Sequence, residues 1–323
     1  MVQCGNIIGI DYMKIRFLAS AHQASASNRI RMMTPSEGFK KLGFDGGFGF
    51  DVDKNTVSVI PKTKTNMLSK VGSSKLVWDV CDNYFSDGRA AQAIQLLKRC
   101  DAVTTTTESL KKEIKSQLKN IGRSVPIHIV DDPVFYEFSD PAFYRQPHNN
   151  DSHINIVWYG YDGNLRYGDW DKLVFTPLSK LDMKFNFTFI NKNGTLPPGH
   201  NKHNIDSNTV RFDPKTQRKY TRAADFVILC IDHTHPFTKG KSHNKLVDGL
   251  ACGTMVLASP QESYTKFSEY AMIGNNFAEN IEWCINNQKE TLNRIKEGQD
   301  YIKEHLSDVA VAKQWIQVAE ETL

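Results

Sequence analysis

The sequence has no paired cysteines of the kind that bind zinc or form a redox motif. Its six cysteines are scattered over 323 residues, and no two of them stand in a Cys-x-x-Cys spacing. Cys230 and Cys252 lie in apolar surroundings that are typical of buried thiols. The pattern therefore favours a reduced, cytoplasmic location over a disulfide scaffold or a structural zinc site.

Long apolar runs, a signal-peptide pattern and low-complexity tracts are also missing, which argues against a membrane-spanning or secreted chain. No strong charge of one sign is present either. Residues 1–150 carry a net charge of +5 and residues 151–323 a net charge of −1. The positive charge of residues 1–150 suits an anionic ligand but is far from a strong nucleic-acid signature.

Short apolar runs alternate with amphipathic helical patterns through both halves of the chain. This order is typical of parallel sheets that are covered by helices on both faces. A single core is near its size limit at 323 residues, so two domains are expected. A polar, proline-containing stretch at residues 131–152 predicts the boundary, with domains at 1–145 and 146–323. Residues 1–12 could be an extension before the first strand.

The most informative stretch is residues 239–259, where a basic loop runs into a short amphipathic helix, a glycine and an apolar strand. Lys239, Lys241 and Lys245 lie at the predicted helix N-terminus. Lysine is electrostatically disfavoured there, because the helix N-terminus itself carries partial positive charge. Free N–H groups and three ammonium groups together predict a binding site for a phosphate.

The pattern of residues 239–259 resembles the donor-binding segment of nucleotide-sugar glycosyltransferases with the GT-B fold, especially their large retaining branch. Residues 100–110, 154–164 and 220–230 resemble other segments of the same fold, so the similarity covers residues 75–270. The resemblance implies an α/β protein with two Rossmann-like, doubly wound domains that face a cleft. The first domain would bind the acceptor and the second the donor, and the last helix, residues 308–323, would cross back to the first domain.

The resemblance also implies roles for particular residues of the second domain. Lys239 and Lys241 would neutralise the diphosphate, and Ser242 and Asn244 would cap the helix or bind a phosphate oxygen. Asp248 would accept hydrogen bonds from the ribose hydroxyls. The further candidates for donor contacts are Gly160, Asn164, Arg166, Phe212 and Lys245.

In the first domain, a small polar loop follows the first predicted strand and leads into a helix. It would line the acceptor site with His22, Ser25, Arg29 and Arg31. Asp79 lies near the end of a later predicted strand, and Asp82 follows that strand. One of these two carboxylates could take the acceptor proton in an inverting enzyme. A retaining enzyme needs no such base.

The function predicted from these patterns is metal-independent transfer of a hexose or pentose from a nucleotide diphosphate sugar to a hydroxyl group. The donor is a co-substrate, and no bound cofactor is expected. The acceptor stays open between a glycan, a lipid-linked intermediate and duplex DNA with a hydroxymethylated base, as in phage genomes. Residues 61–75 hold four lysines and no acid, which would suit DNA. A catalytically silent GT-B domain that only binds a nucleotide or an anionic polymer is the alternative from another class.

Overall fold

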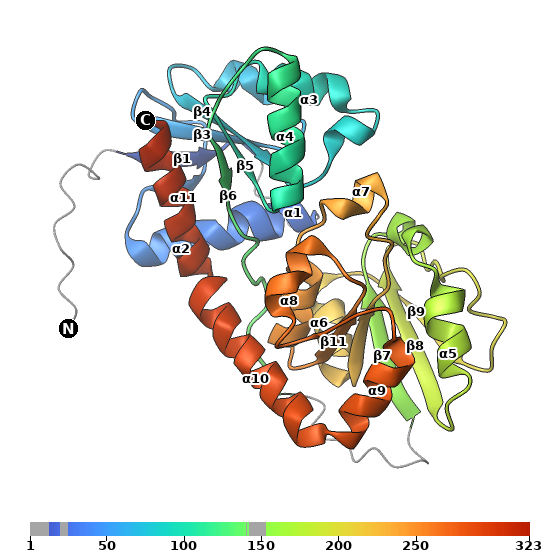
Figure 1. The fold of residues 1–323 in the computed structure, drawn as a ribbon. Coiled ribbons are helices and arrows are strands. Elements are labelled where there is room, and N and C mark those ends of the chain that lie inside the picture. Colours follow the sequence, from blue (N-terminus) through green and yellow to red (C-terminus); the bar gives the residue numbers. More distant parts are fainter. Residues whose placement is uncertain (1–12, 20–24, 140, 142–152) are drawn as a thin grey trace. The chain divides into compact units, whose positions relative to one another are not determined.

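The computed structural model describes residues 13–19, 25–139, 141 and 153–323. The chain divides into two compact units, one of residues Met1–Pro133 and His305–Leu323 and the other of residues Val134–Glu304. The units thus divide twelve residues before the predicted boundary at 145, and much of the predicted linker lies outside the described residues. So does the predicted extension at residues 1–12. Each unit contains a six-stranded parallel sheet with helices, as the sequence predicted (Figure 1).

The sheet of the first unit has the strand order β2-β1-β3-β4-β5-β6, and all its pairs are parallel. The strands are β1 (Lys14–Phe17), β2 (Gly46–Phe48), β3 (Thr56–Pro61), β4 (Lys75–Val80), β5 (Ala102–Thr105) and β6 (Ile127–Ile129). All six residues of β3 are buried, as a strand covered on both faces requires. The three-residue strand β2 was not predicted, because two of its residues are glycines.

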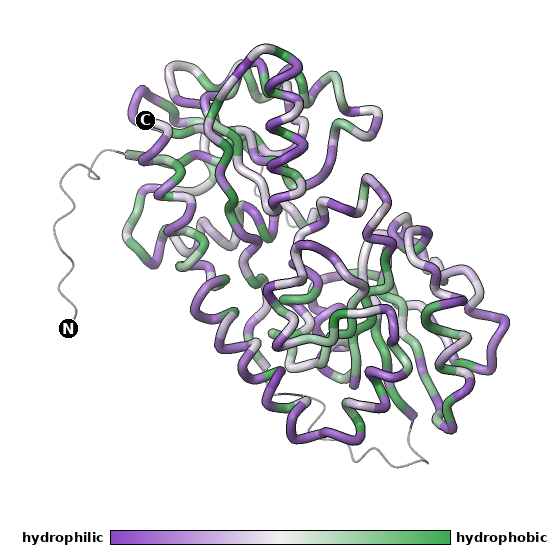
Figure 2. The backbone as a smooth tube through the Cα atoms, in the orientation of Figure 1, coloured by the Kyte–Doolittle hydropathy of each residue, from purple (hydrophilic) through white to green (hydrophobic). Residues whose placement is uncertain are grey.

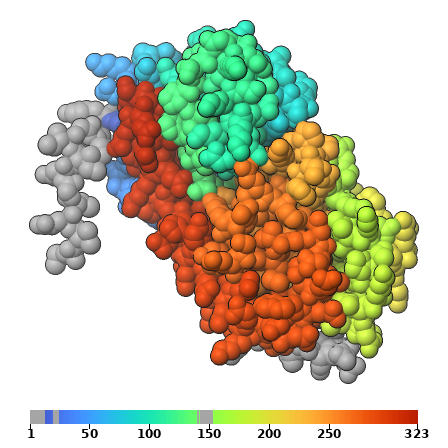
Figure 3. Space-filling model, in the orientation of Figure 1, coloured from blue at the N-terminus to red at the C-terminus, as the bar shows by residue number. Residues whose placement is uncertain are grey.

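Helices cover both faces of this sheet. The longer ones are α2 (Thr34–Leu42), α3 (Ala90–Leu97), α4 (Glu108–Asn120) and α11 (Asp308–Thr322), and the short turns are α1 (Ala26–Asn28), η2 (Arg29–Met33), η3 (Thr65–Lys70) and η4 (Tyr84–Ser86). The α4 helix begins where the Thr107 hydroxyl accepts a hydrogen bond from the Leu110 amide. Its buried residues recur every four positions, and its outward face lies at the molecular surface (Figure 3).

The second unit repeats this plan with the strand order β12-β11-β10-β7-β8-β9. The strands are β7 (His153–Tyr159), β8 (Lys184–Asn191), β9 (Asp206–Arg211), β10 (Phe226–Leu229), β11 (Met255–Ala258) and β12 (Met272–Ile273). The central strands are apolar along their length, whereas the edge strand β9 is polar (Figure 2). The two-residue strand β12 is too short to produce a sequence pattern, and it was not predicted.

The helices of the second unit follow its strands. They are η6 (Asp162–Tyr167), η7 (Asp171–Phe175), α5 (Thr176–Leu178), α6 (Pro214–Ala223), α7 (Pro236–Lys239), α8 (Asn244–Ala251), η8 (Glu262–Phe267), α9 (Phe277–Asn286) and α10 (Gln288–His305). Gly253, with φ of 78°, ends α8 and turns the chain into β11. The loop, helix, turn and strand predicted for residues 239–259 are therefore present.

The C-terminal helix α11 packs inside the first unit, next to α2 (Figure 1). Trp315 of α11 is buried in the core that β1 and α2 also form, and its ring lies 5.4 Å from the Phe17 ring. The two helices approach closely at Gly38. A Cβ atom at Gly38 would clash with the carbonyl oxygen of Asp308 and lie 2.8 Å from the Cβ of Ala312. The absence of a side chain at this position thus permits the helix packing.

Replacing Gly38 with alanine should therefore lower the stability of the first unit, although alanine favours helix formation. We expect a loss of about 1–3 kcal/mol, the range for overpacking a well-filled core. The shift of the urea midpoint measures it. Gly88→Ala is the matched control, because a Cβ atom at Gly88 meets nothing within 4 Å. Equal midpoints for both variants would contradict the proposed packing constraint.

Candidate functional site

The predicted donor residues lie at the carboxyl ends of the strands of the second unit. β7 is paired with β8 on one side and with β10 on the other, so the chain winds away from β7 in both directions. Ligands of open parallel sheets bind at such a point, just beyond the strand ends. The loop after β7 holds Gly160, and the segment after β10 leads through α7 to the N-terminus of α8.

Lys245, in the first turn of α8, reaches the end of β7. Its ammonium nitrogen lies 4.9 Å from the centre of the Trp158 ring, and a Cβ atom at Gly160 would clash with it. Desolvation, followed by the charge of Lys241, lowers the pKa of Lys245 from 10.5 to about 7. Among the residues that the structure describes, no carboxylate forms an ion pair with this ammonium group. A cation held in this way would gain from a bound anion.

The N-terminus of α8 offers further hydrogen-bond donors beside Lys245. The sequence predicted that Ser242 or Asn244 would cap this helix, but the N-cap residue is His243, and its side chain makes no capping hydrogen bond. The His243 ring instead packs 5.3 Å from the Phe267 ring. The His243 side chain thus does not compete with an anion for the first N–H groups of α8.

An aromatic cluster, formed by Tyr167, His235 and Phe237, connects the loop after β7 to α7. The Tyr167 ring lies 4.6 Å from the His235 ring and 5.6 Å from the Phe237 ring. Two predicted donor residues lie against this cluster. Arg166 stacks 4.8 Å from the Tyr167 ring, and the Lys241 ammonium lies 4.1 Å from the Phe237 ring. Sequence analysis missed Tyr167 and Phe237, because rings in a loop carry no periodic signal.

Asp248 lies on α8, one turn after Asn244, and is 8 % exposed. Burial raises the pKa of Tyr159, and the nearby Asp248 charge raises it further. The Tyr159 hydroxyl donates a hydrogen bond of 2.6 Å to the Lys245 carbonyl and so ties α8 to the end of β7. Asp248 is thus mostly buried near the strand end, and its contact with a ribose stays a prediction.

The other predicted donor residues lie around the same edge of the sheet. Lys239 is the last residue of α7 and is exposed. Asn164 lies in η6, where its amide donates to the Tyr161 carbonyl. Phe212 directly follows β9, and its amide donates to the carbonyl of Asn191 at the end of β8.

In the first unit, two predicted site residues lie together in a buried ion pair. The Arg31 guanidinium donates to both carboxylate oxygens of Asp79, at 3.2 and 2.5 Å, and to Asp132 at 3.1 Å. Thr104 also donates to Asp79, at 2.8 Å, and the Trp315 ring lies 5.6 Å from the guanidinium carbon. Arg31 and Asp79 are 2 % and 1 % exposed. These contacts suit a buried structural ion pair better than an accessible general base at Asp79 or an anion-binding group at Arg31.

The other predicted site residues of the first unit lie in different surroundings from one another. Ser25 caps α1 by accepting a hydrogen bond from the Asn28 amide, and Arg29 is 5 % exposed. Asp82 follows β4 and is partly exposed. His22 lies outside the described residues. The roles of these four residues in acceptor binding or proton transfer stay predictions.

The described residues lack a metal centre and a membrane-spanning helix. No group of three or more His, Cys, Asp or Glu side chains could hold a metal ion there. No helix in those parts of the chain combines the length and the apolar character that crossing a membrane requires.

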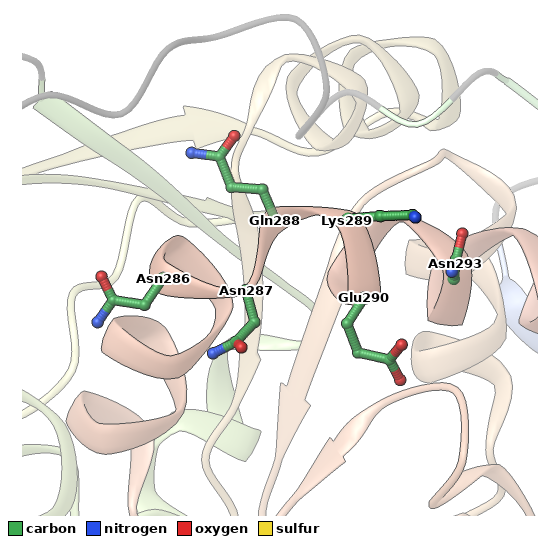
Figure 4. Close-up of a pocket in the computed structure, with 6 residues that line it drawn as sticks. All are labelled: Asn286, Asn287, Gln288, Lys289, Glu290 and Asn293. Carbon is green, nitrogen blue, oxygen red and sulfur yellow. The ribbon is translucent and has the colours of Figure 1, made fainter.

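A pocket of about 520 Å³ lies at the junction of α9 and α10, lined by Asn286, Asn287, Gln288, Lys289, Glu290 and Asn293 (Figure 4). It contains none of the predicted site residues.

Removing the cation from the buried ion pair should destabilise the first unit strongly. In Arg31→Met, the carboxylates of Asp79 and Asp132 lose their shared countercharge, so we expect a loss of about 3–5 kcal/mol. The urea midpoint of the variant measures this loss. The control is Lys40→Met, which breaks an exposed pair with Glu37 and should cost at most about 1 kcal/mol. A similar small effect of both substitutions would contradict the structural role of Arg31.

Comparison with known proteins supports the fold. No family model and no curated protein sequence matches the chain. Among solved structures, Alr3699/HepE from Anabaena in complex with UDP and glucose has a TM-score of 0.64 at 12 % identity, with 96 % of this chain and 100 % of that chain covered. Sucrose-phosphate synthase from Thermosynechococcus elongatus has a TM-score of 0.57 at 12 % identity, with 88 % and 75 % covered. The trehalose-6-phosphate synthase OtsA has a TM-score of 0.58 at 11 % identity, with 91 % and 77 % covered.

These similarities, together with the two parallel sheets, confirm the predicted fold. The chain has the GT-B fold, built from two Rossmann-like units.

Proposed function

We propose that this protein transfers a sugar from a nucleotide diphosphate donor to a hydroxyl group of an acceptor. The observation that carries the proposal is the ammonium group of Lys245, which is desolvated and lies beside Gly160 without a carboxylate partner in the described residues. A diphosphate bound there would supply the missing negative charge. It would also receive hydrogen bonds from N–H groups at the N-terminus of α8, where the His243 side chain makes no capping bond.

The same residues would assist the reaction itself. As the bond between sugar and phosphate breaks, negative charge grows on the diphosphate leaving group. Lys241 and Lys245 would stabilise that charge, and Lys239 and Arg166 would add positive potential from the surface. Asp248 would bind the ribose through its carboxylate. HepE, which has a similar fold, holds UDP or UDP-glucose in its structures, so uridine donors are the first to test.

The proposed acceptor is a hydroxyl group of a sugar or glycan. The comparisons give no support to duplex DNA, and one of the four lysines that suggested it, Lys75, is paired with Asp101 at 3.4 Å. Asp79 is an unfavourable general base, because its oxygens already accept hydrogen bonds from Arg31 and Thr104. Transfer with retention, in which the departing diphosphate takes the acceptor proton, needs no such base, and the partly exposed Asp82 is the remaining candidate base for inversion.

The proposal is tested first by a thermal-shift screen against nucleoside diphosphates and their sugar esters. We expect one diphosphate and its sugar ester to raise the melting temperature. Release of the diphosphate in the presence of a sugar acceptor then tests turnover. A protein that binds a donor but never turns it over would favour the catalytically silent alternative, and the absence of any binding would contradict the donor site.

The low pKa of Lys245 predicts that donor affinity depends on pH. Below pH 7 the free protein already carries the ammonium charge. Above pH 7 that group is neutral in the free protein, so a bound diphosphate must draw a proton onto it. UDP-glucose affinity should therefore be highest below pH 7 and should fall by up to about tenfold per pH unit above it, until the pKa of the complex is reached.

Calorimetry with UDP-glucose between pH 6 and 9 measures this dependence, because its diphosphate diester has no proton that titrates in that range. Lys245→Met should weaken binding at pH 6 by about 1–3 kcal/mol and should remove the pH dependence. Lys239→Met is the control: the side chain of Lys239 is exposed, so its loss should weaken binding but preserve the pH dependence. A wild-type affinity that is constant from pH 6 to 9 would contradict the role of Lys245.

A further inference from the structure

The pocket at the junction of α9 and α10 lies at the far end of the second unit from the candidate donor site. In an open parallel sheet, each helix that follows a strand returns from the carboxyl edge towards the amino edge. The α9 helix begins shortly after β12 and has 10 residues, so it returns by about 15 Å to Asn286. Figure 1 shows α7 and the junction at opposite ends of this unit. A ligand in the pocket would therefore leave the donor site open.

The residues that line this pocket are all polar, and together they carry no net charge. Four of the six end in primary amides: Asn286, Asn287, Gln288 and Asn293. The other two, Lys289 and Glu290, carry opposite charges. A lining of this kind disfavours an apolar ligand and offers no excess charge to an ion. The volume of about 520 Å³ is in the range of sites for small molecules.

Two of the lining side chains are held in place by their neighbours. The Asn287 amide nitrogen donates a hydrogen bond of 2.8 Å to the Trp283 carbonyl, which leaves the amide oxygen to accept from a ligand. Arg294 donates to the Glu290 carboxylate at 3.3 Å, and its guanidinium carbon lies 5.3 Å from the centre of the Trp283 ring. Asn287 and Glu290 point to the same side of the chain in Figure 4. The pocket thus presents two positioned acceptors, which lowers the entropy lost on binding.

The other three amides are not used by the protein itself. Within the described residues, the side chains of Asn286, Gln288 and Asn293 form no hydrogen bond with protein atoms. Each amide offers one accepting oxygen and two N–H donors, and each sugar hydroxyl both donates and accepts. One amide can therefore serve two neighbouring hydroxyls. A cluster of amides without net charge matches a neutral, polyhydroxylated ligand.

We propose that this pocket is a non-catalytic binding site for a neutral oligosaccharide. The inference goes beyond the proposed function, because it assigns glycan binding to a part of the second unit that contains no donor or acceptor candidate. A second site of this kind would raise the effective concentration of a long glycan acceptor at the protein. Its occupation requires neither the donor nor turnover.

The test measures glycan binding by the full-length protein without a donor. An array of neutral oligosaccharides identifies the glycan, and calorimetry compares its affinity for wild type and for a variant with both Gln288→Ala and Asn293→Ala. Both residues lie in α10, where alanine favours the helix, so the variant should fold. We expect its affinity for the glycan to fall by about tenfold, the effect of losing two neutral hydrogen bonds.

The matched control carries Gln92→Ala and Gln95→Ala, which remove two exposed amides from α3 of the first unit. Its affinity for the glycan should stay within about twofold of wild type. Wild-type affinity should also stay the same with saturating UDP-glucose, because the donor site is remote, and at high salt, because the ligand is neutral.

The outcomes separate this inference from the proposed function. An array on which no neutral oligosaccharide binds would overturn the inference. An affinity that the α10 variant retains, or that the control lowers equally, would also overturn it. Competition by UDP-glucose would place the glycan in the donor site and have the same consequence. A protein that binds the glycan through α10 but binds no nucleoside diphosphate would support this inference and contradict only the donor site.

Discussion

The parallel pairing of β7 with both β8 and β10 is the constraint on which the candidate site depends. Because all strands of this sheet run the same way, their carboxyl ends lie along one edge, and every connection returns over a face of the sheet. Residues far apart in the sequence therefore meet there: Gly160 after β7, and Lys241 and Lys245 after β10. The hydrogen bond from Tyr159 to the Lys245 carbonyl and the one from Ser263 to the Lys241 carbonyl hold this edge together. Each donor contact that we propose uses a residue placed by this arrangement.

The two units bury cations in different ways, and the difference separates structure from function. Arg31 is surrounded by acceptors, with Asp79 and Asp132 as counterions, so its charge is compensated inside the protein. Lys245 is also withdrawn from water but has an aromatic ring and a second lysine as neighbours, and its pKa falls to about 7. A compensated buried charge stabilises a particular arrangement of the chain, whereas an uncompensated one is a cost that a ligand can remove. The first arrangement suits a scaffold and the second a binding site.

The sequence was sufficient to predict the fold because its signals are local and repeated. Apolar runs such as Phe226–Leu229 and the helix, glycine and strand of residues 244–258 identify a doubly wound protein. It also indicated Lys241, Lys245 and Gly160 together, and these residues are close in the structure, whereas their role in donor binding stays a prediction. It could not predict that Arg31 would pair with Asp79, because 48 positions separate the two residues and no periodic pattern connects them. Nor could it identify Tyr167 and Phe237 as parts of an aromatic cluster, because that cluster forms only when the chain has folded.

Buried polar and charged side chains that are equally withdrawn from water differ in whether they have partners among the described residues. Gln299 and Gln261 are buried to nearly the same extent, and within the described part of the chain only the side chain of Gln299 has hydrogen-bond partners. The two buried cations differ in the same way: Arg31 has carboxylate partners, whereas Lys245 has none among the described residues. In both comparisons the unsatisfied member lies at the carboxyl edge of the second sheet, whereas the satisfied member holds structural elements together. Because an unpaired buried group lowers the stability of the empty protein, a ligand that pairs with it gains affinity from the same free energy. The loss of stability that the unpaired groups cause in the unliganded protein and the proposed affinity for a nucleotide sugar therefore have one physical origin.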